Sequence, residues 1–482
     1  MLDFRPILHV IGILLTTLSV AMCAPLVADL MTGHPDWQVF AGSAGLTAFI
    51  GITLLLTTMT PPARMSVRQA FVLTTASWLA MTFFAALPFA FANLELNFTD
   101  AFFEAMSGLT TTGSTVISSL DTAPTGILLW RAILQWLGGI GIIVMSIAVL
   151  PMLKIGGHQL FQTESSDRSE KVLPRAAQIA SGVGFVYLIL TAFCASLLWL
   201  TGLSGFDAIA HAMTTIATGG FSTRDGSIGA FSNTYAELII TGFMVLGALP
   251  FVLYLQAVRG KPMMLIRDRQ VRWFFLIVMF FIITVSASHY GNNDITLGRA
   301  AREAAFNVIS IMTGTGYSSS NYATWGAFAT GIFFFIMFIG GCAGSTTCSI
   351  KVFRYQVLYQ TAKMQLKRLI RPHGVFIATF NGKPITDEVE NSVMSFFFLF
   401  VLTFVVLASL LHFIGLDFIT AISGAATAIC NVGPALGEII GPTGNFSALP
   451  DSAKWVLSAG MLLGRLELFT VLVLFAPWFW RG

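Results

Sequence analysis

The stretch GLTTTGST, residues 108–115, is a run of small and mostly polar residues between two apolar segments of the chain. In contact with lipid, its backbone and hydroxyl groups would lack hydrogen-bond partners, at a cost of several kcal/mol for each group. Short polar segments built on one glycine recur three more times, at intervals of about 100 residues. One structural explanation must therefore account for all four segments.

The composition identifies the class of protein before any motif does. Of the 482 residues, 55% are hydrophobic and only 10% are charged, and the mean hydropathy is +0.79. These values are typical of an integral membrane protein. Because the first apolar segment has no A-x-A-like cleavage site, we interpret it as a retained span and not as a signal peptide. By length and apolar content we expect ten transmembrane helices, over residues 6–30, 37–59, 69–92, 125–153, 179–203, 234–258, 270–290, 325–350, 392–414 and 454–480.

The distribution of charge predicts the orientation in the membrane. Cytoplasmic loops carry an excess of Lys and Arg. If the N-terminus is inside, 20 of the 26 Lys and Arg residues fall on the inner side, whereas acids such as Asp100, Asp207 and Glu303 fall outside. We therefore expect both termini in the cytoplasm, and an outer face whose negative potential concentrates cations.

After the first two spans, the chain repeats a unit of span, short amphiphilic stretch, glycine loop and span. The loops TTTGST, ATGGFS, GTGYSS and NVGPAL align on Gly113, Gly220, Gly316 and Gly433. Each follows a run of about 12 residues, which is too short to cross a bilayer: DAFFEAMSGLTT, DAIAHAMTTIAT, EAAFNVISIMTG and TAISGAATAICN. We expect these runs to be four re-entrant pore helices that enter from the outside and surround a pore with pseudo-fourfold symmetry.

Such an arrangement explains the polar residues at membrane depth. Non-helical backbone is tolerated there only where it is buried in protein or lines a water-filled cavity. The C-terminal ends of four half-helices would each direct roughly half a negative charge at a common centre, which favours a cation. Glycine after each helix can adopt the positive φ that turns carbonyls toward one axis, and a ring of carbonyls can replace the hydration shell of an ion. The four segments are predicted to form the wall of an ion filter.

These segments and the repeats around them resemble the Trk/Ktr/HKT superfamily of potassium transporters, and within it the membrane subunits of bacterial Trk systems, over essentially the whole chain. The resemblance implies an all-α integral membrane protein whose single chain supplies four M1–P–M2 units for potassium uptake, with K⁺ as the transported ion and no cofactor. It implies a two-helix hairpin over residues 1–65 and pore repeats over 66–160, 161–262, 263–374 and 375–482. The filter ligands that it implies are backbone carbonyls of Thr111, Thr112, Gly113, Thr218, Gly219, Gly220, Gly314, Thr315, Gly316, Asn431, Val432 and Gly433.

The resemblance also implies partners and a location. They are a homodimer with one pore in each protomer, a bacterial inner membrane, and control by a cytosolic nucleotide-binding regulatory subunit similar to TrkA. The chain carries no Walker A or Rossmann fingerprint, so any control by nucleotide has to come from such a partner. We expect no nucleic-acid partner.

Two features are predicted to lie below the filter. The run GGCAGSTTCS, residues 340–349, supports a regular helix poorly, and the resemblance implies an intramembrane loop that obstructs the pore; the alternative is a close helix–helix contact of small residues. Arg465 lies inside the last expected span, where an isolated charge is costly; it either faces the pore or is a structural ion-pair partner. The predicted gate residues are Gly340, Gly341, Gly344, Ser345, Thr346 and Arg465.

On the cytoplasmic side, residues 354–371 have the pattern of a basic amphipathic helix. Residues 375–385 are predicted to form a β-hairpin that turns at Asn381-Gly382.

Two other classes of protein compete with this interpretation. A secondary transporter that couples a solute or K⁺ to Na⁺ or H⁺ would also use broken helices, but it should show two inverted halves and a buried carboxylate, and Glu467 is the only acid that the expected spans place deep. A membrane-embedded enzyme would need a convergent His/Cys/Asp set, whereas the seven histidines are dispersed. We therefore expect no enzyme, and we expect His211, in a pore-helix segment, to pack or form hydrogen bonds.

Overall fold

The structure is a computed structural model that describes residues 2–59, 65–148 and 172–481. It is almost entirely helical, with one two-stranded hairpin among the described residues, so the predicted all-α membrane fold is confirmed. Seven described helices are long and apolar enough to cross a bilayer, and two bent pairs raise that number to nine. The seven are α1 (Arg5–Thr32), α2 (Trp37–Thr57), α3 (Val67–Phe91), α5 (Thr125–Ala148), α7 (Val172–Leu200), α12 (Arg269–Asn292) and α16 (Asp387–Phe413).

Four shorter helices lie where the sequence predicted pore helices. Each begins at a side chain that caps its first turn, because Asn97, Ser204, Thr296 and Asp417 each accept a hydrogen bond from the backbone N–H three residues later. All four are mostly buried. They are α4 (Phe98–Leu109), α8 (Gly205–Ile216), α13 (Leu297–Met312) and α17 (Phe418–Cys430).

Three expected spans are not continuous helices. The span predicted over 234–258 is α9 (Thr234–Ala248) and α10 (Phe251–Val258), bent by 94° at Leu249-Pro250, because proline disfavours helical backbone in the residue before it. The span over 454–480 is α18 (Asp451–Arg465) followed by Phe469–Phe475 at 108°, with positive φ at Glu467 and Leu468. The span over 325–350 is helical only in α14 (Ala327–Ile336).

Short elements connect these helices. The hairpin of β1 (Thr379–Phe380) and β2 (Lys383–Pro384) turns at Asn381 and Gly382, which both have positive φ, so the predicted hairpin is confirmed. The remaining described elements are η1 (Leu120–Thr122), η3 (Ser227–Phe231), α11 (Met263–Arg267), η4 (Tyr322–Thr324), α15 (Val352–Ile370), α19 (Phe469–Leu472), η5 (Val473–Phe475) and α20 (Pro477–Trp480).

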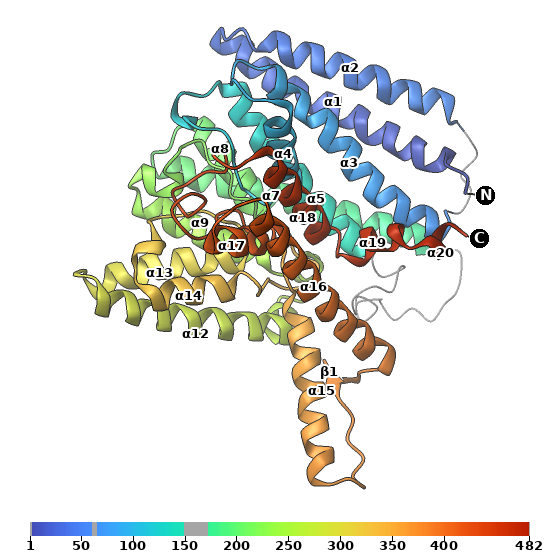
Figure 1. The fold of residues 1–482 in the computed structure, drawn as a ribbon, viewed down its shortest axis with the longest axis vertical. Coiled ribbons are helices and arrows are strands. Elements are labelled where there is room, and N and C mark those ends of the chain that lie inside the picture. The colour runs from blue at the N-terminus through green and yellow to red at the C-terminus, as the bar shows by residue number, and fades with distance from the viewer. Residues whose placement is uncertain (1, 60–64, 149–171, 482) are drawn as a thin grey trace.

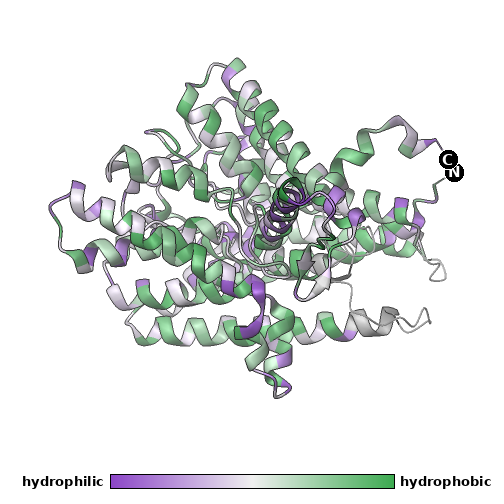
Figure 2. Ribbon diagram, turned by 90° about the horizontal axis from the view of Figure 1, so that it is seen from below, coloured by the Kyte–Doolittle hydropathy of each residue, from purple (hydrophilic) through white to green (hydrophobic). Residues whose placement is uncertain are grey.

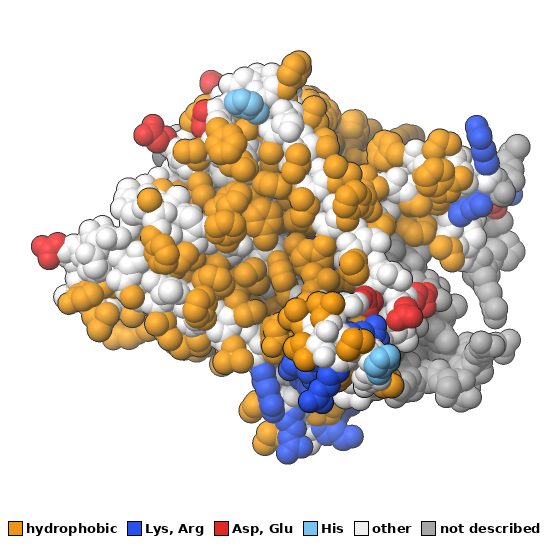
Figure 3. Space-filling model, turned by 60° about the horizontal axis from the view of Figure 1, so that its bottom comes forward, with side chains coloured by type: hydrophobic (Ala, Val, Ile, Leu, Met, Phe, Trp, Pro, Cys, Tyr) orange, Lys and Arg blue, Asp and Glu red, His pale blue; other side chains and the backbone are white. Residues whose placement is uncertain are grey.

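The elements are arranged around the pore helices. Helices α1 and α2 lie together along one side of the molecule, and α15 projects from the opposite side with the hairpin beside it (Figure 1). Hydrophobic residues dominate the helices, and hydrophilic residues gather mostly at helix ends and in connecting segments (Figure 2). On the face in Figure 3, a broad hydrophobic surface lies between an edge with acidic side chains and an edge at which Lys and Arg gather together with some acidic side chains. This surface is what a protein surrounded by lipid requires.

Candidate functional site

The four pore helices end in one repeated backbone structure. Just after each helix one residue has left-handed φ, between 49° and 68°; it is the second residue after α4, α8 and α13 and the first after α17. The aligned glycine two residues later again has positive φ, between 77° and 107°. In every repeat the N–H of the residue between them bonds the carbonyl five residues earlier, and the N–H of the left-handed residue bonds the carbonyl three residues earlier. This is the Schellman motif. The first set of bonds is Thr112 to Ser107, Gly219 to Thr214, Thr315 to Ser310 and Val432 to Thr427, at 2.8–3.1 Å.

Only one of the four left-handed positions holds a glycine, Gly314. The others are Thr111, Thr218 and Asn431. Threonine is branched at Cβ and rarely adopts this conformation, so the two threonines store strain, of about 1–2 kcal/mol each. Such strain persists where the surrounding structure over-determines the backbone, which is common at functional sites.

The aligned glycines close a ring of carbonyls. A methyl group placed on Gly113 would lie 2.3 Å from the carbonyl oxygen of Gly219, in the next repeat. A methyl group on Gly220 would likewise clash with the carbonyl oxygen of Thr315, and one on Gly316 would lie 2.0 Å from the oxygen of Val432. A methyl group on Gly433 would lie 2.7 Å from the oxygen of Thr112, in the first repeat. Each glycine therefore faces the carbonyl just before the aligned glycine of the following repeat, and the fourth returns to the first. The ring is narrow, because the Gly113 methyl would also lie 3.6 Å from the oxygen of Thr315.

The structure thus brings together all twelve residues predicted for the filter, three from each repeat. Successive residues of alternating backbone handedness can turn their carbonyls to the same side, and glycine makes this possible without a Cβ clash. The four repeats do not contribute to the ring in the same way. In the second repeat the Gln135 amide donates to the Gly219 oxygen at 2.5 Å and accepts from the Phe221 N–H at 2.9 Å.

Polar side chains of the pore helices brace the segments that leave the ring. The residue nine positions before the aligned glycine is Glu104, His211 or Asn307 in the first three repeats, and Ser423 lies ten positions before it in the fourth. Glu104 bonds Thr115 and Val116, His211 bonds Ser222, Asn307 bonds Ser319 and Ser423 bonds Leu436. His211 therefore forms hydrogen bonds, as predicted. Sequence analysis missed the set as a whole, although the offset of nine positions in three repeats and ten in the fourth was visible in the aligned runs.

The first brace includes a buried ion pair. Arg131 in α5 donates from Nε to Glu104 at 2.8 Å and from Nη1 to the carbonyl of Ser222 at 2.6 Å, and its guanidinium lies 4.0 Å from the Phe221 ring centre. Glu104 and Asp29 are completely buried, so the expectation that Glu467 is the only deeply placed acid is wrong. Glu104 is buried because the pore helix α4 packs inside the protein, whereas Asp29, in α1, is buried where it accepts a hydrogen bond from the Gly126 N–H at the start of α5.

We expect Glu104→Gln to lower the free energy of unfolding by about 3 kcal/mol, because it leaves the Arg131 guanidinium buried without its carboxylate. Thermal unfolding of the purified protein measures the effect. The control is Glu438→Gln, at an exposed acid in the loop after the fourth filter segment. Equal stabilities of the two variants would contradict the structural role of the ion pair.

Below the ring, residues 340–349 form the non-helical segment that the sequence predicted. Its hydrogen bonds go to the break between α9 and α10: the Cys342 N–H bonds the carbonyl of Ala248, the Thr346 N–H bonds that of Gly247, and the Phe251 N–H bonds that of Gly344. The helix break leaves these groups of α9 and α10 without intrahelical partners. The non-helical loop and the helix break therefore satisfy each other's backbone hydrogen bonds. The alternative, a regular helix–helix contact, does not describe this arrangement.

The predicted gate residues lie at the underside of the filter segments. Thr346 contacts the Thr218 hydroxyl at 3.2 Å, and Cys348 lies 3.8 Å from the Thr111 hydroxyl. Gly341 approaches the carbonyl of Ala248, and Ser345 bonds the carbonyl of Cys342 at 2.6 Å. Gly340 packs on the returning arm, since a methyl group there would lie 2.2 Å from the oxygen of Cys348, and Gly344 has positive φ with open space around it.

Arg465, at the end of α18, joins this loop to another repeat. Its guanidinium donates to the carbonyl of Thr346 at 3.3 Å, to Cys348 at 2.6 Å and to the carbonyl of Gly138 in α5 at 2.9 Å. No ion pair found among the described residues includes it. Glu467 instead pairs with Arg354, which is buried at the start of α15, the helix predicted as basic and amphipathic over residues 354–371. Two roles were predicted for Arg465, a residue that faces the pore and a structural ion-pair partner. These contacts do not support the ion pair.

The comparisons with known proteins agree with this geometry. The family model described as "TrkH: Cation transport protein" matches residues 37–481. A Trk system potassium uptake protein TrkI of Halomonas elongata is 46% identical over 99% of this chain and 97% of its own length. TrkH of Escherichia coli strain K12 is 35% identical over the whole of both chains. The crystal structure of the potassium transporter TrkH from Vibrio parahaemolyticus covers both chains completely, with a TM-score of 0.92 and 35% identity.

Proposed function

This chain belongs to the TrkH family of cation transport proteins, and from that premise we propose that it carries K⁺ into the cell through the carbonyl ring of Thr112, Gly219, Thr315 and Val432. A family of cation transport proteins makes the chain a transporter and not an enzyme. The observation that carries the proposal is the closure of the ring, in which each aligned glycine packs on the carbonyl of the next repeat.

The ring has the chemistry that a dehydrated cation needs. Carbonyl oxygens can take the place of water around K⁺, and the negative ends of four helix dipoles point toward the same region. We propose that carbonyls one residue to either side take part as well, which gives the full set Thr111–Gly113, Thr218–Gly220, Gly314–Gly316 and Asn431–Gly433. The four repeats and their predicted boundaries are part of this proposal.

We also propose an orientation. On the face in Figure 3, Lys and Arg gather at one edge, together with some acids, whereas the opposite edge shows acids alone, and cytoplasmic loops of membrane proteins carry the basic excess. On this basis both termini lie in the cytoplasm of a bacterial inner membrane, and K⁺ enters the ring from the acidic side. A homodimer and a cytosolic nucleotide-binding regulator similar to TrkA stay predictions of the family resemblance.

Flux measurements on the purified protein in liposomes test the transport proposal. We expect uptake of K⁺ and Rb⁺ down their gradients, with Na⁺ entering more slowly. Uptake that occurs only with an opposing or parallel Na⁺ or H⁺ gradient would favour the coupled secondary transporter instead. Equal entry of the three ions would contradict a selective carbonyl filter.

Deleting Ala343–Ser345 is expected to raise K⁺ flux several-fold while the ratio of K⁺ to Na⁺ flux stays the same. The reason is that the loop lies below the ring and obstructs the path without touching the carbonyls that select the ion. Flux of both ions into liposomes measures the change. Lower flux in a well-folded variant would mean that the loop is a packing element and not an obstruction.

A further inference from the structure

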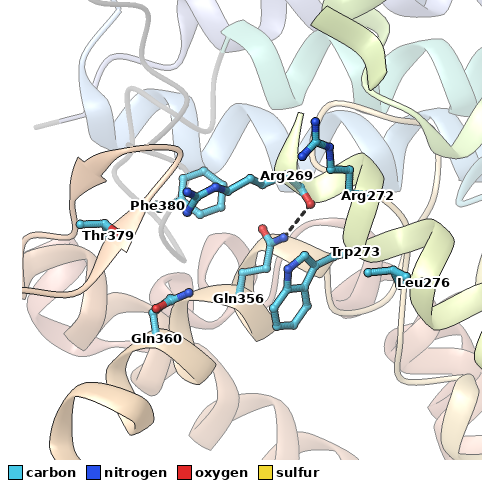
Figure 4. A pocket seen from close by; sticks show the side chains of 8 residues that line it. All are labelled: Arg269, Arg272, Trp273, Leu276, Gln356, Gln360, Thr379 and Phe380. Atoms are coloured by element: carbon cyan, nitrogen blue, oxygen red, sulfur yellow. Dashed lines mark hydrogen bonds between the residues drawn. The ribbon is translucent and has the colours of Figure 1, made fainter. Parts of the chain in front are cut away.

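A second hollow lies away from the filter, between the start of α12, the middle of α15 and the first strand of the hairpin (Figure 4). It has a volume of about 280 Å³. The residues that line it are Arg269, Arg272, Trp273, Leu276, Gln356, Gln360, Thr379 and Phe380. None of them belongs to the ring, the braces or the loop described above.

The pocket combines positive charge with an unused acceptor. Arg269 and Arg272 form no ion pair with any described carboxylate, and Arg272 uses only Nε internally, to bond the carbonyl of Ile266. Gln356 is 4% exposed; its Nε2 donates to the carbonyl of Arg269 at 2.9 Å, whereas its Oε1 has no partner among the described residues. A buried acceptor without a partner is costly. The pocket is therefore suited to a ligand with an anionic group and a hydrogen-bond donor.

The position of the pocket favours an amphiphile. Helix α12 is long and apolar enough to cross a membrane, and the exposed side chains Met279 and Phe280 lie about one turn beyond Leu276, the last residue of α12 that lines the pocket. Trp273, which packs edge-on against Tyr359, lies in the first two turns of α12, and tryptophan is enriched at the ends of membrane-crossing helices. A ligand whose phosphate lies in the pocket can therefore place its acyl chains on the apolar surface of α12, which a free phosphate cannot use.

We propose that this pocket binds the headgroup of an anionic glycerophospholipid, with Arg269 and Arg272 on the phosphodiester and Gln356 Oε1 accepting a hydrogen bond from a headgroup hydroxyl. Arginine side chains suit the phosphate because they present several donors in a planar fork. A hydroxyl fits better than an ammonium, because the two neighbouring guanidinium groups repel a third cation. Phosphatidylglycerol has this chemistry. The proposal does not depend on the filter assignment.

Binding of soluble short-chain lipids to the purified protein in detergent tests the ligand class, with bound molecules counted by native mass spectrometry. The probes are phosphatidylglycerol, phosphatidylmethanol, phosphatidylcholine and inorganic phosphate. Phosphatidylmethanol keeps the anionic phosphodiester but has no headgroup hydroxyl. We expect affinity to fall in the order given, and inorganic phosphate that binds as tightly as phosphatidylglycerol would overturn the lipid assignment.

Variants test the residues. The double change Arg269→Gln with Arg272→Gln should weaken phosphatidylglycerol binding about 30-fold, since each basic residue near an anionic lipid contributes about 1 kcal/mol. Gln356→Leu should bind phosphatidylglycerol and phosphatidylmethanol equally well. The matched control is Arg368→Gln, at an exposed arginine further along α15, which should bind like the unmodified protein.

Three results would overturn the proposal. One is an equal loss of binding in Arg368→Gln, which would mean diffuse attraction to a basic surface. Another is a changed ratio of monomer to dimer in the double variant with its lipid count unchanged, which would make this surface a protein contact. The third is undiminished phosphatidylglycerol binding by the double variant. Both arginines are exposed, so this variant should fold even if Gln356→Leu does not, and thermal unfolding checks each protein.

Discussion

Gly113→Ser is expected to reduce the ratio of K⁺ to Na⁺ flux at least tenfold. Gly113 has φ of 88°, and any β-carbon on it would lie 2.3 Å from the Gly219 oxygen, closer than real contacts allow. The substitution has to move a ring carbonyl or rotate the Gly113 backbone, and a displacement that changes the preference between the ions by 1.4 kcal/mol changes the flux ratio about tenfold. Parallel uptake of K⁺, Rb⁺ and Na⁺ into liposomes measures this ratio.

The control for this substitution is Gly242→Ser. Gly242 lies on the exposed surface of α9, and a β-carbon there would meet no atom within 4 Å. It should leave both flux and selectivity unchanged. If a folded Gly113→Ser protein keeps the selectivity of the unmodified protein, the carbonyl ring is not the selectivity filter.

Arg465→Gln is expected to increase K⁺ flux in the absence of any regulatory partner. A fixed unit charge 4 Å from a K⁺ ion opposes it by about 1 kcal/mol in water and about 4 kcal/mol in a partly buried site. Loss of the charge should therefore raise flux by between about fivefold and about a thousandfold. The effect is on conduction and not on choice of ion, because Arg465 contacts the loop and α5 and not the ring carbonyls.

The same variant distinguishes a gate from a structural role. The Arg465 guanidinium donates hydrogen bonds to two backbone carbonyls and one thiol. Neutralising it therefore breaks no ion pair that the described residues form with it. Flux and thermal unfolding measured on one preparation separate the outcomes. A strongly destabilised protein without a gain in flux would contradict the gating role. Arg354→Gln is a useful comparison, since it removes the buried ion pair between Arg354 and Glu467 and should destabilise the fold.

The repeat was predictable from sequence because each pore helix carries its own local instructions. A cap residue begins each helix, about 12 residues are too few to cross, and the glycine lies three or four residues after the helix end. The structure places four Schellman motifs in the register of that alignment. The intramembrane loop at 340–349 was predictable for a similar reason, since its glycines and hydroxyl residues support a helix poorly.

The braces were harder to recognise. Glu104, His211, Asn307 and Ser423 have different chemistry, so only their similar offset of nine or ten positions relates them. Their partners lie on segments that the sequence does not show to be adjacent. Gln135 gives no signal of its own, because a polar residue in an apolar span has no visible partner before the second repeat folds against it.

By itself, the sequence determined the membrane class, the four short helices, the positions of the glycines that close the ring and the irregular segment, because all of these depend on local composition, helix length and backbone freedom. Tertiary structure alone decided how the repeats meet. Three sets of contacts join residues about 100 or more positions apart. Each aligned glycine packs on a carbonyl of the next repeat, and the 340–349 loop exchanges hydrogen bonds with the α9–α10 break. Glu467 pairs with Arg354 and not with Arg465. Such contacts are set by which groups remain unsatisfied after the helices have formed, and a buried polar group or charge takes the partner that the packed structure places within reach.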